Sequence, residues 1–384
     1  MNKKQGFIQL IAIQAGGAIC LPTILIGQMI ATRYGILSSI VAIVFGNLFL
    51  GILGTCVAHF SAKHRLSTGQ CAEKAFGATA KLPAIQLVLT LLFWFAVQLE
   101  LIAKSVHPFI PWISFSLLIM VLGVAMTLFC LMGMSGLSRL SLIALPLLLG
   151  TLLLACFGKG ATFSPPSASF SPIAISLIIG SGIGAVIDLP TFFSHARSTK
   201  SAIIASLALF GVILPCIQSI GVYLGAKSSS FHLVDILSNA HPFPGWKLWV
   251  LLFLGGAGWT TNQTNLYSAV VNAKMLLPTL SWKKRSLLLG FLGTILGCFM
   301  TAERFEILLQ LVGIALCSLG ACLIVFMLFK RRLPLFIWAL GSILGVVVAF
   351  FKAPVPSLGA FLVSFIFGTV YIMRKLCTHL AIET

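Results

Sequence analysis

The chain has 384 residues, of which 59% are hydrophobic and only 8% are charged. Soluble globular proteins are closer to half apolar and a quarter charged, so this composition excludes a soluble domain. The formal net charge is +18, which in a soluble protein would indicate a nucleic-acid partner. Here the basic residues lie mainly between apolar runs. We therefore expect them to orient the chain in a lipid bilayer and to contact anionic lipid, with no nucleic acid as a partner.

Apolar runs of about 20 residues, long enough to cross a bilayer as a helix, recur along the whole chain. We therefore predict an all-α polytopic membrane protein with twelve transmembrane helices. The first run is too long for a signal peptide and lacks an Ala-x-Ala site, so we expect no cleaved leader. The expected spans are near residues 8–31, 36–60, 83–104, 111–133, 138–157, 172–193, 201–225, 247–270, 286–301, 306–329, 334–351 and 355–374.

The spans divide the chain into two halves of similar length and an appendix. Residues 1–157 hold helices 1–5, residues 158–332 hold helices 6–10, and residues 333–384 hold helices 11 and 12 and a tail. Because each half has an odd number of spans, the two halves enter the membrane in opposite orientations. This organisation predicts a five-plus-five inverted repeat followed by two extra helices.

The basic residues are distributed unevenly between the two sides that these spans define. If the N-terminus is cytoplasmic, the inner connections hold most of the 25 Lys and Arg residues, among them Lys63, Arg65 and Arg332. Cytoplasmic loops carry an excess of Lys and Arg, so we place both termini in the cytoplasm and the chain in the plasma (inner) membrane. The outer side keeps Arg33, Lys104, Lys159, Lys227, Lys247, Arg304 and Lys352.

Two spans, one in each half, carry a Gly-rich stretch that ends in Leu-Pro. Residues 14–22 read Gln-Ala-Gly-Gly-Ala-Ile-Cys-Leu-Pro, and residues 180–190 read Gly-Ser-Gly-Ile-Gly-Ala-Val-Ile-Asp-Leu-Pro. Glycine permits unusual backbone angles and proline removes a helical N–H, so both stretches favour a broken helix. Matched breaks in helices 1 and 6 indicate the binding site of an inverted-repeat transporter. The alternative is packing, because Gly and Pro are common in membrane helices.

The span near 247–270 is the most polar of the twelve. Its residues 260–265 read Thr-Thr-Asn-Gln-Thr-Asn and would be costly against lipid, so the stretch faces a cavity or other helices. The hydroxyls of Thr260 and Thr261, together with carbonyls freed by a broken helix, are oxygen ligands that suit a small hard cation. The alternative is that these side chains only join helices through hydrogen bonds.

The third span offers an aromatic ring and an amide on one face. Trp94 and Gln98 are one helical turn apart and therefore share that face. Tryptophan provides a flat surface for stacking, and the glutamine amide provides both a donor and an acceptor for a planar polar ligand. Such a pair also occurs in ordinary helix packing, which is the alternative interpretation.

Two acidic residues, Glu100 and Asp188, lie inside predicted spans. A carboxylate there is costly, so both are candidates for a proton-binding or gating role. The alternative for Glu100 is an i,i+4 ion pair with Lys104. Asp188, two residues before Pro190, could instead cap the backbone that the proline frees.

The other reactive residues do not indicate an enzyme. Ten cysteines are scattered without a CxxC pair, and seven histidines show no metal-ligand spacing. A clustered nucleophile, base or metal set is also absent from the sequence pattern. We therefore expect no enzymatic activity and no cofactor other than a coupling ion.

Six stretches, taken in order, form a recognisable pattern. They are residues 46–48, the loop 61–77, 82–95, 133–146, 180–181 and 254–267. The pattern resembles the cytosine and hydantoin permeases of the nucleobase–cation symporter family, which have the amino acid–polyamine–organocation superfamily fold. The resemblance extends over about residues 8–332 and implies a bundle and a scaffold built from the inverted repeat.

The resemblance also implies two sites. A sodium site would use the carbonyls of Gly16, Ile19 and Ala257 and the hydroxyls of Thr260 and Thr261. The substrate would lie between the ring of Trp94 and the break in helix 6, with Gln98, Ser181, Gly182, Asn262 and Cys20 nearby.

Four positions depart from the family pattern. Gly182 stands where these permeases often have an aromatic residue that stacks on the substrate, and Cys20 replaces a larger residue. Thr191 and Ser194 stand where an acidic and a basic residue follow the break. We therefore expect a pocket that is wider on one side than that of a cytosine permease.

Together these features predict a monomeric symporter that imports a small planar nitrogenous solute. The solute would be a nucleobase such as cytosine, or a purine, hydantoin or allantoin-like ring, and the coupling ion Na⁺ or H⁺. The alternative is a proton-coupled amino-acid permease of the same fold, which would hold the carboxylate and ammonium groups at helix termini. Trp94 with Gln98 favours the planar ring.

Overall fold

The computed structural model describes residues 4–156, 171–227, 237, 243–299, 302–351 and 355–383. Within these ranges the chain is helical, without a β-strand. The helices are α1 (Phe7–Ala18), α2 (Leu21–His64), α3 (Thr68–Phe76), α4 (Lys81–Val106), α5 (Phe115–Cys130), α6 (Gly133–Cys156), α7 (Pro172–Phe193), α8 (Thr199–Ala208), α9 (Leu214–Lys227), α11 (Trp246–Asn272), α12 (Trp282–Cys298), α13 (Ala302–Phe329), α14 (Leu335–Phe350) and α15 (Pro356–Glu383).

By length and composition, seven helical segments in the described ranges could each cross a membrane. Three shorter apolar helices, α1, α5 and α14, accompany them. The fold is therefore that of an all-helical, multi-pass membrane protein.

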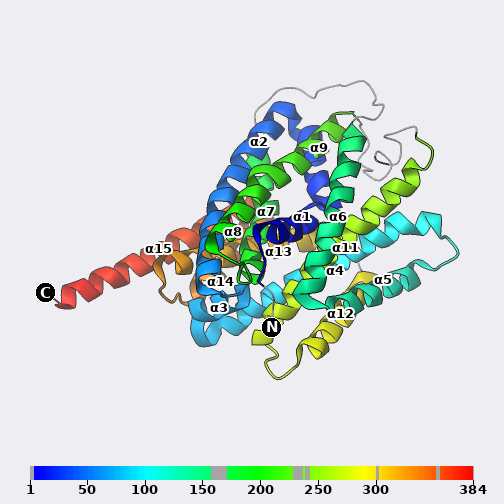
Figure 1. The fold of residues 1–384 in the computed structure, drawn as a ribbon. Coiled ribbons are helices and arrows are strands. Elements are labelled where there is room, and N and C mark those ends of the chain that lie inside the picture. Colours follow the sequence, from blue (N-terminus) through cyan, green and yellow to red (C-terminus); the bar gives the residue numbers. More distant parts are fainter. Residues whose placement is uncertain are drawn as a thin grey trace.

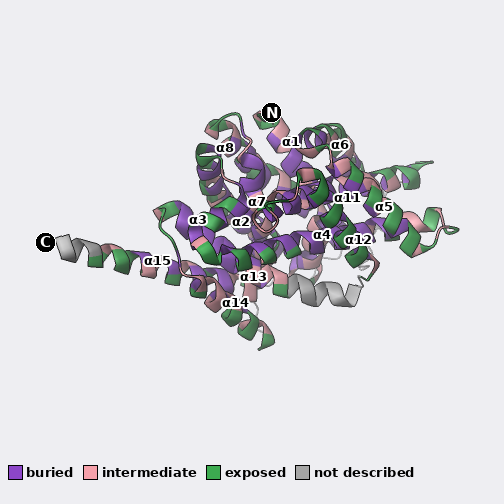
Figure 2. Cartoon of the chain, turned by 90° about the horizontal axis from the view of Figure 1, so that it is seen from below, coloured by how far each residue is buried: buried purple, intermediate pink, exposed green. Residues whose placement is uncertain are grey.

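The helices form a bundle with α1 near its centre (Figure 1). α1 packs against α6 and α11, α2 packs against α7 and α9, and α4 packs against α11 and α12. Buried residues concentrate where α2, α4, α7 and α11 meet (Figure 2). Of the described helices, α15 extends furthest from the bundle (Figure 1). The polar stretch of the sequence on α11 thus lies in the interior and away from lipid.

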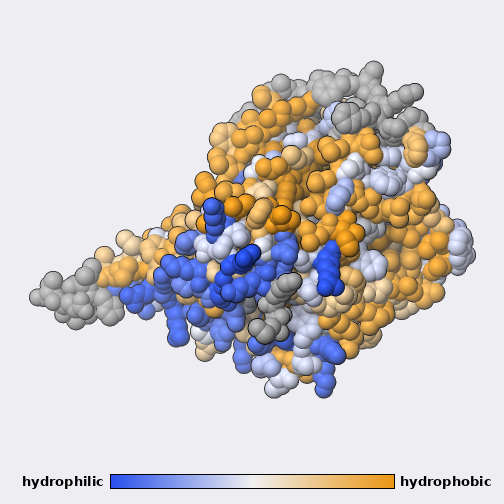
Figure 3. All heavy atoms as spheres, in the orientation of Figure 1, coloured by the Kyte–Doolittle hydropathy of each residue, from blue (hydrophilic) through white to orange (hydrophobic). Residues whose placement is uncertain are grey.

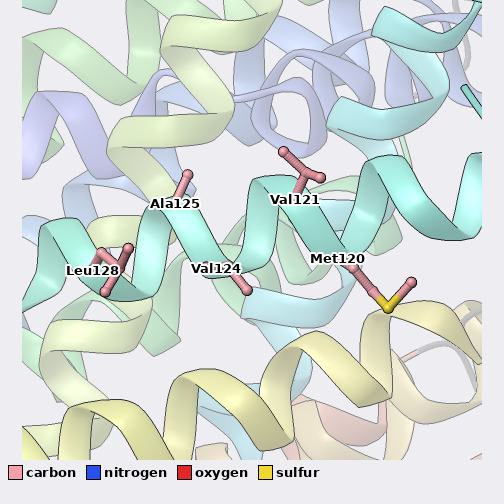
Figure 4. Close-up of a pocket in the computed structure, with 5 residues that line it drawn as sticks. All are labelled: Met120, Val121, Val124, Ala125 and Leu128. Carbon is pink, nitrogen blue, oxygen red and sulfur yellow. The ribbon is translucent and has the colours of Figure 1, made fainter.

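On the face seen in Figure 3, apolar side chains cover most of the surface outside the hydrophilic region around α3, as lipid contact requires. A shallow hollow on α5, for example, is lined by Met120, Val121, Val124, Ala125 and Leu128 (Figure 4). Val121 is 56% exposed and Leu128 54% exposed, and neither offers a polar group. This hollow is an open apolar surface, suited to lipid contact, and is distinct from the polar interior.

The predicted break in helix 1 is present. α1 ends at Ala18, and Ile19 (φ −78°, ψ 82°) and Cys20 (φ −142°, ψ 161°) leave the helical conformation before α2 starts at Leu21. Pro22 occupies the first turn of the new helix, where its missing N–H costs nothing. α2 then continues to Gly35, whose φ of 81° marks the boundary between the first two predicted spans.

The prediction of a break in helix 6, which is α7 in the structure, is wrong. α7 runs uninterrupted from Pro172 to Phe193. Its small residues serve packing: a Cβ on Gly182 would lie 2.3 Å from Leu50 Cδ1 of α2. Pro190 lies inside α7, three residues before its end, and removes one helical hydrogen bond without breaking the helix.

Several connections predicted to be cytoplasmic meet at one end of the molecule. Gln5 and Ala196 form a parallel β-bridge. The Arg65 guanidinium donates to the carbonyls of Ser194 and Ala196, and the Leu333 amide donates to the carbonyl of Ala75 at 2.8 Å. Hydrophilic side chains gather around α3 and the N-terminal end (Figure 3). The structure thus brings the basic loops together, as the charge asymmetry of the sequence predicts.

Candidate substrate and cation sites

The break between α1 and α2 places Cys20 beside α4 and α11. Cys20 is 6% exposed, and its Sγ lies 3.3 Å from Thr23 Oγ1. The thiol is also within interaction distance of the side chains of Gln98 and Thr261. Residues from the two predicted sites, far apart in the sequence, therefore meet at this break.

On α4, Gln98 is 2% exposed and Trp94, one turn away on the same face, is half-buried. The Trp94 ring meets the Phe93 ring edge to face, with 6.4 Å between their centroids. The Gln98 side chain is thus buried near the break, while the Trp94 indole remains partly accessible. This arrangement can present a flat surface and a polar edge to a ring-shaped ligand.

The hydroxyl of Thr261 joins α11 to the broken helix. Its Oγ1 lies 2.8 Å from the Ala257 carbonyl oxygen, 3.2 Å from that of Gly16 and 3.4 Å from that of Gly17. Thr260 Oγ1 lies 3.0 Å from the same Ala257 oxygen. Four of the five predicted cation ligands, namely Gly16, Ala257, Thr260 and Thr261, therefore belong to one oxygen cluster.

The fifth predicted ligand, Ile19, is fully buried at the interruption itself. A hydroxyl that donates its hydrogen keeps lone pairs for a cation, and carbonyl oxygens have a second lone pair. Hard cations such as Na⁺ prefer oxygen ligands of this kind. The residues present therefore fit a small hard cation at the point where α1 and α11 meet.

The other three predicted substrate residues have different surroundings. Asn262 Nδ2 lies 3.4 Å from Met126 Sδ on α5. The exposed Ser181 donates its hydroxyl to the Ile178 carbonyl of its own helix at 2.9 Å. Gly182 packs on α2, as described above. Asn262 thus points toward α5, Ser181 toward its own helix α7, and Gly182 toward α2. The expectation of a pocket widened by Gly182 therefore has no support in this geometry.

The two acidic candidates differ in their partners. Glu100 is 5% exposed and forms the i,i+4 ion pair with Lys104, whose side chain is half exposed. This pairing favours the structural interpretation of Glu100. Asp188 instead accepts a hydrogen bond from Ser268 of α11. The Asp188 side chain therefore connects α7 to α11.

Asp188 is part of a polar cluster formed by Thr68, Asp188, Thr191, Ser268 and Asn272 on α3, α7 and α11. Thr68 Oγ1 lies 3.1 Å from Thr191 Oγ1, and Asn272 Nδ2 donates to Thr191 Oγ1 at 3.1 Å. Asn272 Oδ1 accepts from the Gly69 amide at the start of α3, at 2.7 Å. This polar cluster holds the inner-loop helix α3 against the ends of α7 and α11.

A second contact lies beside the polar cluster. Tyr267 OH is 3.3 Å from His195 Nε2, in the link between α7 and α8. Burial and, to a smaller extent, the charge of Arg65 lower the pKa of His195 below its ordinary value. His195 is therefore neutral at physiological pH and adds no second positive charge beside Arg65.

Sequence reasoning did not single out Thr68, Ser268 or Asn272. Two signals in the sequence could have suggested them: Ser268 and Asn272 are spaced i,i+4 on a helix end, and Thr68 opens a helix after the N-cap Ser67. A further missed residue, Ser141 on α6, is fully buried close to Gly16.

Comparison with known proteins shows the family of the chain. The sequence model of the family described as "Permease for cytosine/purines, uracil, thiamine, allantoin" matches residues 2–342. The cytosine permease of Escherichia coli O157:H7 is 27% identical over 341 residues, which cover 86% of this chain and 80% of that protein. The chain belongs to this family of permeases.

Solved structures show the same fold. The closed conformation of Mhp1, a nucleobase-cation-symport-1 family transporter with bromovinylhydantoin bound, matches with a TM-score of 0.80 at 17% identity, covering 98% of this chain and 94% of that one. The inward-facing conformation of Mhp1 matches with a TM-score of 0.71 at 16% identity and the same coverage. The chain is therefore a membrane permease with the Mhp1-like transporter fold, and its relatives are transporters rather than enzymes.

Proposed function

We propose that this permease is a secondary symporter that imports a small planar nitrogenous solute, such as cytosine or a purine, hydantoin or allantoin-like ring. The observation that carries the proposal is the position of Gln98, which is buried near the break between α1 and α2. The half-buried Trp94 lies one turn away on the same helix. A ring that stacks on the indole could hydrogen-bond to the amide through its polar edge. Family membership and the relation to cytosine permeases support the same solute class.

Na⁺ is the coupling ion that the donor set supports best. The carbonyls of Gly16, Ile19 and Ala257 and the hydroxyls of Thr260 and Thr261 would hold it between α1 and α11. A bound cation would supply positive charge that joins the broken helix to α11. Since Cys20 lies near both Gln98 and Thr261, the cation and substrate sites would be neighbours, which gives a direct physical route for coupling.

The polar cluster fits the role of an inner gate. It ties α3, α7 and α11 together near the end where the basic loops meet, and transport toward that side would require these contacts to open. In this proposal Asp188 is a gating residue and H⁺ is the second candidate coupling ion.

The topology of the proposal is twelve spans in a five-plus-five inverted repeat, with residues 1–157 and 158–332 as the repeats and 333–384 as the appendix. The inner membrane is the expected location, with both termini in the cytoplasm, because the basic loops gather at one end. The protein would act as a monomer.

A proton-coupled amino-acid permease is the second candidate. It would use helix termini at breaks in both halves. Of the two predicted breaks, the one after α1 is present and offers freed termini, whereas α7 is continuous. This observation favours the ring-binding function.

Uptake into proteoliposomes tests the choice. Purified protein would be offered radiolabelled cytosine, adenine, hydantoin, allantoin and a set of amino acids, with and without an inward Na⁺ gradient. We expect uptake of at least one planar ring and stimulation of that uptake by Na⁺. Uptake of amino acids alone, driven by a proton gradient, would overturn the proposal in favour of the second candidate.

A further inference from the structure

Ser141 on α6 carries a buried hydroxyl near the proposed cation site. It is 0% exposed, and its Oγ has no hydrogen-bond partner. Leaving a buried hydroxyl unpaired costs about 1–3 kcal/mol. Thr151, ten residues further on the same helix and equally buried, avoids this cost because it donates to the Leu147 carbonyl at 2.8 Å. The free hydroxyl of Ser141 therefore needs an explanation.

The position of Ser141 provides one. A Cβ built on Gly16 would lie 3.1 Å from Ser141 Oγ and 3.3 Å from Thr260 Cβ. Ser141, Thr260 and Gly16 thus converge on one point between α6, α11 and α1. The Gly16 carbonyl is the same group that accepts the hydrogen bond from Thr261. The unpaired hydroxyl accordingly lies beside the oxygen cluster proposed to bind the cation.

We propose that Ser141 Oγ is a sixth ligand of this cation, in addition to the oxygens of Gly16, Ile19, Ala257, Thr260 and Thr261. The inference rests on the proposed Na⁺ coupling and extends it to a third helix. A hydroxyl oxygen matches the preference of a hard cation, and the cation satisfies the lone pairs that the protein leaves free. Occupancy of the site would then hold α6, as well as α11, against the broken helix α1.

A purely structural role for Ser141 makes a different prediction. If the hydroxyl only fills space, its removal relieves an unpaired polar group, and Na⁺ binding does not change. The two roles therefore differ in direct Na⁺ affinity, which can be measured without substrate or transport.

The test is Na⁺-dependent thermal stabilisation of the purified full-length protein in detergent, with choline replacing Na⁺ at constant ionic strength. Ser141→Ala deletes the hydroxyl. Ser141→Cys retains the side-chain volume but substitutes sulfur, a poor ligand for a hard cation. Thr151→Val is the control, because it removes an equally buried hydroxyl from the same helix.

We expect both Ser141 variants to need roughly tenfold more Na⁺ for half-maximal stabilisation, a loss typical of groups that support a metal site. In choline, where no cation occupies the site, Ser141→Ala should unfold at or above the wild-type temperature because the unpaired hydroxyl is gone. Thr151→Val should keep the wild-type Na⁺ requirement. If the wild type responds to Na⁺ and both Ser141 variants respond equally well, the ligand role of Ser141 is wrong while Na⁺ coupling stands. If the wild type itself shows no Na⁺ response, the proposed Na⁺ coupling and this inference both fail.

Discussion

Thr261 Oγ1 and the carbonyl oxygen of Gly16 lie 3.2 Å apart, although 245 residues separate them in the chain. The bond connects the polar stretch of α11 to the last turn of α1 before its break. Because the Gly16 carbonyl lies so near the end of α1, it has lone-pair capacity that the middle of a helix would not offer. A cation at this point would bind both helices at once.

Thr261→Ala should therefore weaken Na⁺ binding. We expect the Na⁺ concentration for half-maximal uptake to rise roughly tenfold, since one of the proposed oxygen ligands is removed. Uptake into proteoliposomes over a Na⁺ series measures this. Thr294→Ala is a matched control, because Thr294 is also 6% exposed but donates to the Gly290 carbonyl within α12. An unaltered Na⁺ requirement in Thr261→Ala, with normal expression, contradicts the cation site.

Two features could be predicted from the sequence: the break in helix 1 and the helix face that Trp94 and Gln98 share. Gly16, Gly17 and Pro22 favour a local interruption of the helix, and the backbone is non-helical at Ile19 and Cys20. The face shared by Trp94 and Gln98 follows from helical periodicity alone. Such properties depend on residues close in the sequence, so a sequence pattern can represent them.

The remaining features depend on tertiary partners. The stretch from Gly180 to Gly182 resembles another break. A glycine can either unwind a helix or let a neighbouring helix approach closely, and the sequence does not show which. Here Gly182 lets Leu50 of α2 approach. The direction of Asn262 toward Met126 is likewise set by α5. Helical periodicity alone cannot identify these partners.

Asp188→Ala should loosen the inner end of the protein. Removing the carboxylate deletes the acceptor for Ser268 and weakens the polar cluster that holds α3. Cys71 on α3, which is fully buried, should then react with N-ethylmaleimide several-fold faster, as followed by mass spectrometry. Asp188→Asn preserves an acceptor oxygen and should have a smaller effect. Equal Cys71 reactivity in wild type and Asp188→Ala would show that Asp188 does not close the inner end.

Acidification should destabilise the contact between His195 and Tyr267. The pKa of His195 is lowered in the folded protein, whereas the unfolded chain has the ordinary value of about 6.5. The unfolded state therefore binds the proton more readily, and this contribution to stability is present above about pH 6.5 and lost as the pH falls below it. Thermal unfolding at pH 7.5 and 5.5 should show a smaller acid-induced decrease for His195→Gln than for the wild type. An identical decrease in both proteins would assign the acid sensitivity to other groups.

Gln98→Leu should change which rings bind. The substitution leaves the polar edge of a bound ring unpaired in a buried site, at a cost of about 1–3 kcal/mol. In a competition assay we expect polar-edged rings such as cytosine to lose at least tenfold in affinity relative to less polar rings. Gln98→Glu, which retains acceptor oxygens but loses the amide donors, should spare rings that donate to residue 98. The same ranking of competitors in all three proteins would remove Gln98 from the substrate site.

Trp94→Ala should lower the affinity for the planar solute without changing the Na⁺ requirement. Stacking of a base on an aromatic side chain contributes about 1–3 kcal/mol in nucleic-acid systems, so the half-saturating substrate concentration should rise about tenfold or more. Trp94→Phe keeps a ring and should recover much of this loss. Because Gly182 packs on Leu50 and provides no ring of its own, the Trp94 indole carries the stacking proposal. Near-normal affinity in Trp94→Ala, measured by substrate saturation in proteoliposomes, would contradict the planar-substrate assignment even if Na⁺-driven uptake persisted.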